Sequence, residues 1–184
     1  MSLKFKWTVP VLALAGAVAA VAAPSAAAAP ATAQDVSENW AGYVASGPST
    51  GSGFSSVSGS WVQPSANCSS GDGDSAFWVG LGGASGQSQS LEQIGTEANC
   101  SGGSAQQYAW YELVPAAPVQ LNMTINPGDQ ISAKVTVNGT EVIVSLSDHT
   151  TGGSATKTLQ MSNPDTSSAE WIAEAPSTCD SSGD

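Results

Sequence analysis

Short runs rich in aromatic and β-branched residues recur from Asn39 onward, and they constrain the fold of this chain more than any other feature. Glycine, serine and the turn sequences Asn-Pro-Gly and Asn-Gly separate these runs, and no stretch sustains an apolar period of 3.6 residues. Strands are therefore expected at residues 39–47, 54–64, 75–83, 89–97, 106–115, 119–125, 130–139, 141–149, 154–161 and 168–176. About ten strands in this arrangement predict an all-β domain, a two-sheet antiparallel β-sandwich that spans residues 34–184.

Residues 1–33 have the composition of a secretory signal peptide. Two lysines precede an apolar, alanine-rich run at residues 9–23, and small residues ending at Ala29 or Ala33 offer a cleavage site. The alternative is a single transmembrane anchor, which the short run and its flanking prolines disfavour. We therefore expect a secreted, extracellular protein.

The charge of the remaining chain excludes several partners. Residues 34–184 hold two lysines, Lys134 and Lys157, no arginine and all 15 carboxylates, which gives a net charge of −13. A protein binds nucleic acids and anionic membranes through basic side chains, so we expect neither as a partner. We also expect a monomer. The acidity serves either solubility or tolerance of acid, because a chain with few basic groups gains little positive charge when its carboxylates protonate.

Three cysteines are an odd number for an exported chain, in which pairing is expected. We predict a disulfide between Cys68 and Cys100, because both follow asparagine in loops rich in serine and glycine. Cys179 is then either an unpaired thiol or paired with a residue beyond Asp184 in a longer natural chain, and we favour the second interpretation.

Alternation of side chains along the expected strands predicts an unusual sheet face, since every second residue of a strand points the same way. One face is expected to gather Trp78, Gln93, Trp110, Glu112, Glu170 and Glu174. A sheet face lined by aromatic and a few polar side chains is typical of a ligand cleft. The other tryptophans of the sandwich are assigned to the core: Trp40, Trp61 and Trp171.

Several catalytic chemistries lack the residues that they need. His149 is the one histidine and lies in an expected turn, and no nucleophile elbow surrounds any serine, which argues against a Ser-His-Asp triad. Metal-ligand spacings and a phosphate-binding loop are also missing from the sequence, so we expect no metal and no cofactor. Carboxylate and amide chemistry remain.

Five motifs in order, "NWAGYV", "FWVGL", "EQIGTE", "YAWYELVP" and "AEWIAE", resemble those of the glutamic peptidases. These are the eqolisins, the fungal acid endopeptidases of the scytalidoglutamic type, and their bacterial relatives. The resemblance covers residues 39–174 and implies a sandwich of the concanavalin A-like or jelly-roll type. It also implies metal-free cleavage of polypeptides at acid pH.

The resemblance implies roles for single residues. Gln93 stands at the position of the catalytic glutamine and Glu174 at that of the catalytic glutamate, with Trp78, Trp110 and Glu112 as substrate-binding residues. Glu170 shares the strand face of Glu174, so we group it with the substrate-binding residues and expect it to tune Glu174 as a hydrogen-bonding partner. The chain has Gly82 where the family commonly has an aspartate, and we expect the last strands of the family fold to lie beyond Asp184.

Two other functions remain open at this point. An exported sandwich with exposed tryptophans is suited to carbohydrate binding, and Glu112 with Glu174 has the residue types of a glycosidase acid and base pair. A truncated family member without activity is the third interpretation.

Overall fold

The computed structural model describes residues 36–47 and 53–176. The predicted signal peptide and Cys179 lie outside the described residues, so both remain predictions. No helix among the described residues has the length and the apolar character that crossing a membrane requires.

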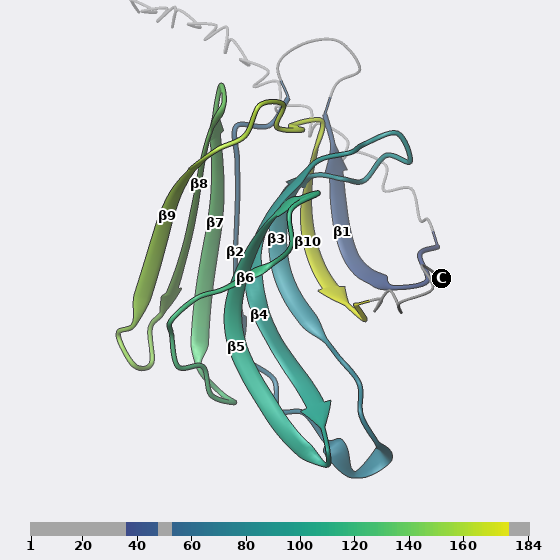
Figure 1. Cartoon of the computed structure of the whole chain (residues 1–184), viewed down its shortest axis with the longest axis vertical. Coiled ribbons are helices and arrows are strands. Elements are labelled where there is room, and N and C mark those ends of the chain that lie inside the picture. The colour runs from purple at the N-terminus through teal and green to yellow at the C-terminus, as the bar shows by residue number, and fades with distance from the viewer. Residues whose placement is uncertain (1–35, 48–52, 177–184) are drawn as a thin grey trace, which may run out of the picture. The chain divides into compact units, whose positions relative to one another are not determined.

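Within residues 36–47 and 53–176, ten strands form two antiparallel sheets, which confirms the predicted all-β sandwich (Figure 1). The six-stranded sheet has the order β1-β10-β3-β4-β5-β6, with bounds Trp40–Ser46, Ser168–Glu174, Ala76–Gly82, Leu91–Ser101, Ser104–Val114 and Val119–Gln120. The four-stranded sheet has the order β2-β7-β8-β9, with bounds Ser56–Val62, Gln130–Asn138, Glu141–Asp148 and Ser154–Gln160. Nine of the ten predicted runs overlap a strand of seven or more residues, whereas the run 119–125 contains only the two residues of β6.

The β7–β8 hairpin shows how the sequence produces these strands. Buried and less buried residues alternate along both strands, as the apolar alternation predicts. The predicted Asn-Gly turn connects them, and Gly139 has a φ of 62°, a conformation that glycine adopts without strain. The register of the hairpin therefore follows from its turn and its buried face.

The inner faces of the two sheets enclose the main core, which includes Val79, Leu81 and Ile94 of the six-stranded sheet and Val135, Val144 and Leu146 of the four-stranded sheet. Trp61 packs against this core, as predicted. Trp171 does not, and its assignment to the core was wrong. Its side chain is 38% exposed, because the described part of the four-stranded sheet ends at β2, where the indole N–H donates to the Ser58 carbonyl over 2.8 Å.

The last strand, β10, is inserted between β1 and β3, as Figure 1 shows. Trp40 of β1 pairs with Glu174 of β10, and Ile172 of β10 pairs with Trp78 of β3. Three of the five motifs thereby become neighbours in one sheet, although they lie far apart in the sequence.

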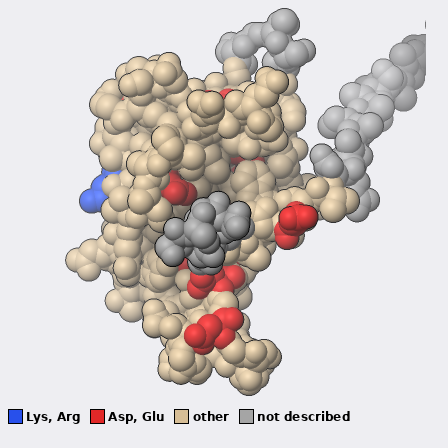
Figure 2. All heavy atoms as spheres, turned by 45° about the vertical axis from the view of Figure 1, so that its right-hand side comes forward, with Lys and Arg blue, Asp and Glu red and all other residues tan. Residues whose placement is uncertain are grey.

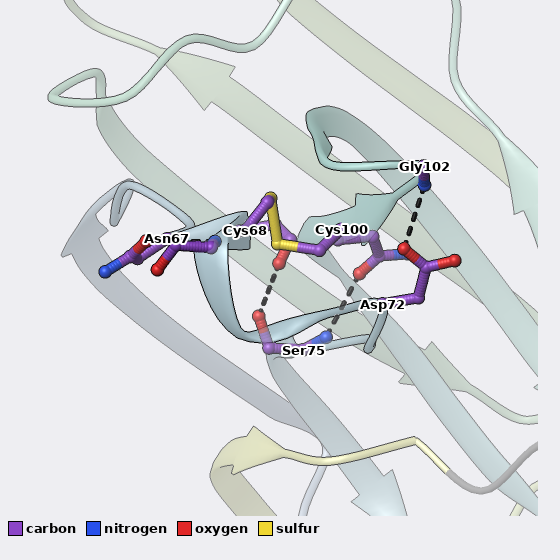
Figure 3. Close-up of a disulfide and its surroundings, with 9 residues drawn as sticks. Asn67, Cys68, Asp72, Ser75, Cys100 and Gly102 are labelled. Carbon is purple, nitrogen blue, oxygen red and sulfur yellow. Dashed lines mark hydrogen bonds between the residues drawn. A yellow bond between two sulfur atoms is a disulfide. The ribbon is translucent and has the colours of Figure 1, made fainter.

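The predicted disulfide between Cys68 and Cys100 is present, with an S–S distance of 2.03 Å (Figure 3). It joins the short 3-10 helix Cys68–Ser70 to the end of β4. The Ser75 hydroxyl donates to the Ala98 carbonyl over 2.7 Å, and the Gly102 amide donates to Asp72 over 2.8 Å. These contacts hold the loop before β3 against the far end of the β4–β5 hairpin.

Candidate functional site

We call the surface of the six-stranded sheet that points away from the four-stranded sheet its outer face. Strand register places the predicted site residues on this face in three rows. The first row is Glu170, Gly80, Gln93 and Glu112; the second is Ile172, Trp78, Gly95 and Trp110; the third is Glu174, Ala76, Glu97 and Tyr108. All six predicted site residues therefore share one sheet face.

Apolar side chains cover the middle of the outer face. Trp78, Trp110 and Ile172 are buried there in a second cluster, separate from the main core. Trp40 packs against this cluster, its ring edge-to-face with Trp78 at a centroid distance of 5.0 Å. Trp40, which was assigned to the core, therefore packs against this second cluster and not against the main core between the sheets. The sequence does not show that β1 lies beside β10, which is what brings Trp40 to this face.

Two donors hold the half-buried Glu174 carboxylate. The Trp78 indole N–H donates to Oε2 over 2.7 Å, and the Asn39 amide donates to Oε1 over 3.2 Å. Two donors on different carboxylate oxygens fix the direction in which this side chain points. Asn39 was missed as a site residue, although it begins the "NWAGYV" motif on which the resemblance partly rests.

Gln93 and Glu112 form a second polar pair on neighbouring strands. The Gln93 amide nitrogen donates to Glu112 Oε2 over 2.6 Å, whereas Gln93 Oε1 has no hydrogen-bond partner among the described residues. Burial raises the pKa of Glu112, the bond from Gln93 opposes this, and the charge of Glu174 raises the pKa further. The carboxylates of Glu112 and Glu174 are thus close enough to interact electrostatically.

Glu170 lies in the same row as Gln93 but has a different environment. Its side chain is 0% exposed, and burial raises its pKa to about 7, with the Ser168 hydroxyl opposing the shift and the charge of Asp165 adding to it. Neither carboxylate oxygen has a hydrogen bond of ordinary geometry among the described residues. The Trp78 ring and Leu91 lie over Gly80, where a Cβ would be 2.9 Å from each of them, so apolar atoms fill the place between Glu170 and Gln93.

A third polar group, not predicted from the sequence, lies in the third row, which also contains Glu174. Glu97 accepts hydrogen bonds from the Tyr108 hydroxyl over 2.6 Å and from the Asn99 amide. Burial and the Glu97 carboxylate both raise the pKa of Tyr108, which therefore stays a donor. Glu97 stands four residues after Gln93 on one strand, and this even spacing in the sequence predicts that both side chains lie on the same face.

The outer face has no basic side chain among the described residues. Lys134, Lys157 and His149 belong to or follow strands of the four-stranded sheet. Figure 2 shows acidic groups at several places on one face of the molecule and basic atoms only near its edge. In the described ranges, no group of three or more histidine, cysteine or acidic residues is arranged to hold a metal ion.

Two hollows in the described part of the chain lie away from these residues. One lies over serines of β2, β7 and β8, and another lies beside Asn122 and Ser154. Neither contains a predicted site residue.

Comparisons with known proteins identify the family. The model of the Peptidase A4 family matches residues 38–183. A crystal structure of scytalido-glutamic peptidase with a transition state analog inhibitor is 31% identical, with a TM-score of 0.66, and the match covers 79% of this chain and 68% of that chain. A structure of SCP-B, described as a member of the eqolisin family in complex with the tripeptide Ala-Ile-His, is 30% identical, with a TM-score of 0.63 and coverages of 79% and 67%.

The aspergilloglutamic peptidase from Aspergillus niger is also similar, at 28% identity and a TM-score of 0.53, with 58% of this chain and 65% of that chain covered. A comparison with curated protein sequences found no match. The carbohydrate-directed alternative has no support in these findings. The chain belongs to the Peptidase A4 family and is a peptidase of the glutamic type.

Proposed function

We propose that the chain is a secreted acid endopeptidase in which Glu174 activates the attacking water and Gln93 stabilises the oxyanion. The observation that carries this proposal is the contrast between two glutamates of β10. Glu174 is half-buried and held by two donors, whereas Glu170 has no exposed surface. A general base must reach the water from which it takes a proton, so accessibility favours Glu174.

Protonation favours the same residue. Because the pKa of Glu170 is raised to about 7, Glu170 is neutral at acid pH and accepts no proton there. Exposure and hydrogen bonding thus distinguish the two glutamates of this strand. The register still places Glu170, not Glu174, in the row of Gln93, so the assignment depends on exposure and charge rather than on row.

The proposed reaction begins with the ionised Glu174 carboxylate, which takes one proton from water while the water oxygen attacks the peptide carbonyl carbon. The carbonyl oxygen becomes an oxyanion in the tetrahedral intermediate. When the carbon–nitrogen bond breaks, Glu174 returns the proton to the leaving amine, and the carboxylate is restored. Trp78 and Asn39 keep the carboxylate in place during both transfers through the bonds described above.

Gln93 supplies an uncharged donor to this intermediate. Its amide nitrogen carries two hydrogens, and one of them is directed to Glu112. The second is available to the oxyanion, a contact worth roughly 3–4 kcal/mol in comparable acyl-transfer sites. In this proposal Glu112 orients the amide, so Gln93 presents nitrogen rather than oxygen to the substrate.

The family membership supports a polypeptide substrate, and the composition of residues 1–33 supports secretion. The test is digestion of an unfolded protein such as casein between about pH 2 and 6 by the whole chain as it is exported. Gln93→Ala is expected to lower kcat by ~10²–10³-fold, the usual loss for one oxyanion donor. Gln160→Ala, in β9 of the other sheet, is the matched control.

Two outcomes would contradict the proposal. Equal activity of Gln93→Ala and Gln160→Ala would remove Gln93 from the mechanism. No cleavage of any unfolded protein by the folded wild-type chain would favour the third interpretation, a family member without activity.

A further inference from the structure

The residue Asp165 lies in the connection between β9 and β10, outside every motif that the sequence analysis selected. Its side chain is half-buried and lies against Gly82, at the end of β3. A Cβ on Gly82 would be 2.5 Å from Asp165 Cβ and 2.7 Å from the Asp165 carbonyl oxygen. Asp165 therefore occupies the space that a side chain at position 82 would need. Gly82 also has a φ of 81°, a conformation that favours glycine.

Four hydrogen bonds connect Asp165 to its surroundings. Its carboxylate accepts from the Ser88 hydroxyl, from the Gly83 amide over 3.3 Å and from the Ser167 amide over 2.9 Å. Its own backbone amide donates to Glu92 Oε1 over 3.2 Å. We call these contacts the Asp165 clamp. The clamp joins the end of β3, the β3–β4 loop and β4 to the segment that leads into β10.

These are the strands that carry the proposed site. Gln93 directly follows Glu92 in β4, and Glu174 is the last residue of β10, the strand that begins at Ser168, shortly after Asp165. We propose that Asp165 is a positioning residue, which ties the start of the strand carrying Glu174 to the strand carrying Gln93. This inference rests on the proposed function, because it assumes that these two side chains act together.

The hydrogen bonds of the clamp favour the ionised form of Asp165. Burial alone raises the pKa of Asp165, but the donors from Ser88, Ser167 and Gly83 outweigh it and lower the pKa. The Asp165 carboxylate therefore stays ionised, and keeps accepting these bonds, to a lower pH than an ordinary aspartate.

The test compares two aspartates that each hold a turn. Asp165→Ala removes the clamp, whereas Asp148→Ala, the matched control, removes a carboxylate that accepts from the Thr150 and Thr151 amides after β8. We expect Asp165→Ala to lower kcat by ~10–100-fold with little change in KM, since small displacements of catalytic groups cost this much. Asp148→Ala is expected to lower stability but to leave kcat unchanged.

A second readout does not depend on turnover. The indole N–H of Trp78 donates to Glu174, so its NMR resonance reports the position of that carboxylate. We expect this resonance to shift in Asp165→Ala and not in Asp148→Ala. If Asp165→Ala does not fold, Ser88→Ala removes one donor to the clamp and is expected to shift the same resonance by less.

An unchanged kcat and an unchanged Trp78 resonance in folded Asp165→Ala would overturn the inference, as would equal losses of kcat in the two aspartate variants. A shifted resonance combined with full activity of Gln93→Ala would instead refute the proposed function, while the clamp itself stands.

Discussion

Glu92 predicts an unusual dependence of stability on pH. Its side chain is 0% exposed and points from β4 into the space between the sheets, beside Ile94 on the same strand face. One carboxylate oxygen accepts from the Asp165 amide and the other has no partner among the described residues. Burial raises the pKa of Glu92 from 4.5 to about 8; the Asp165 amide opposes the shift, and the charges of Asp165 and Glu170 add to it.

The sign of the effect follows from the proton balance. Below pH 4.5 both the folded and the unfolded chain bind this proton, so the stability is at its full value. Between pH 4.5 and about 8 the unfolded chain loses the proton while the folded chain keeps it, so the free energy of unfolding falls as the pH rises. Each unit of pKa shift is worth about 1.4 kcal/mol, so the free energy of unfolding falls by at most about 5 kcal/mol between pH 4.5 and about 8.

Glu92→Gln removes the titration and keeps the shape. We expect its free energy of unfolding to match the wild type within about 1 kcal/mol at about pH 4.5 and to exceed it at about pH 8, because glutamine has no charge to bury. Urea unfolding at both pH values measures this difference. Glu141→Gln, at the start of β8, removes the same charge and serves as control. A Glu92→Gln variant that is less stable than wild type at the higher pH would refute the reasoning.

Three further predictions concern the site and its supports. Trp78→Phe is expected to lower kcat by about tenfold, because it removes a hydrogen bond to a charged group. The control is Trp110→Phe, since the indole N–H of Trp110 has no partner among the described residues. Equal losses of kcat in the two variants would contradict the role of the Trp78 bond. Replacing Cys68 and Cys100 by serine is expected to lower the free energy of unfolding by ~4 kcal/mol, given their separation of 32 residues, and an unchanged urea midpoint would be the contrary result. Casein cleavage is expected to continue after dialysis against a chelator, and its loss would point to a metal-dependent mechanism.

The fold and the shared face of the site could be predicted from the sequence because both depend on local patterns. Alternation within one strand is enough to place Trp110 with Glu112, whereas the pairing of Gln93 with Glu112 comes from the strand register, which was not predicted. The order of the strands in a sheet, in contrast, depends on contacts between residues that are far apart in the sequence. The insertion of β10 between β1 and β3 decides the positions of Trp40, which packs against the second cluster, and of Trp171, which was assigned wrongly to the core.

The contacts of Asp165 show the same limit. Its segment has no strand pattern, and it meets Gly82 and Glu92 only because β10 pairs with β3. Burial of Glu170 also depends on neighbours from other strands, so the sequence contains no sign that two glutamates four residues apart have different environments.

The central claim is that Glu174, rather than Glu170, is the general base. The most direct test is kcat at about pH 4 for Glu174→Gln and Glu170→Gln, with the fold of each variant checked by its unfolding midpoint. We predict a loss of ~10²–10⁴-fold for Glu174→Gln, the usual contribution of a general base. Glu170→Gln is expected to retain activity near that of the wild type, because Glu170 is already neutral at this pH, below its pKa of about 7. Near-normal turnover by folded Glu174→Gln, together with an inactive Glu170→Gln, would contradict the assignment.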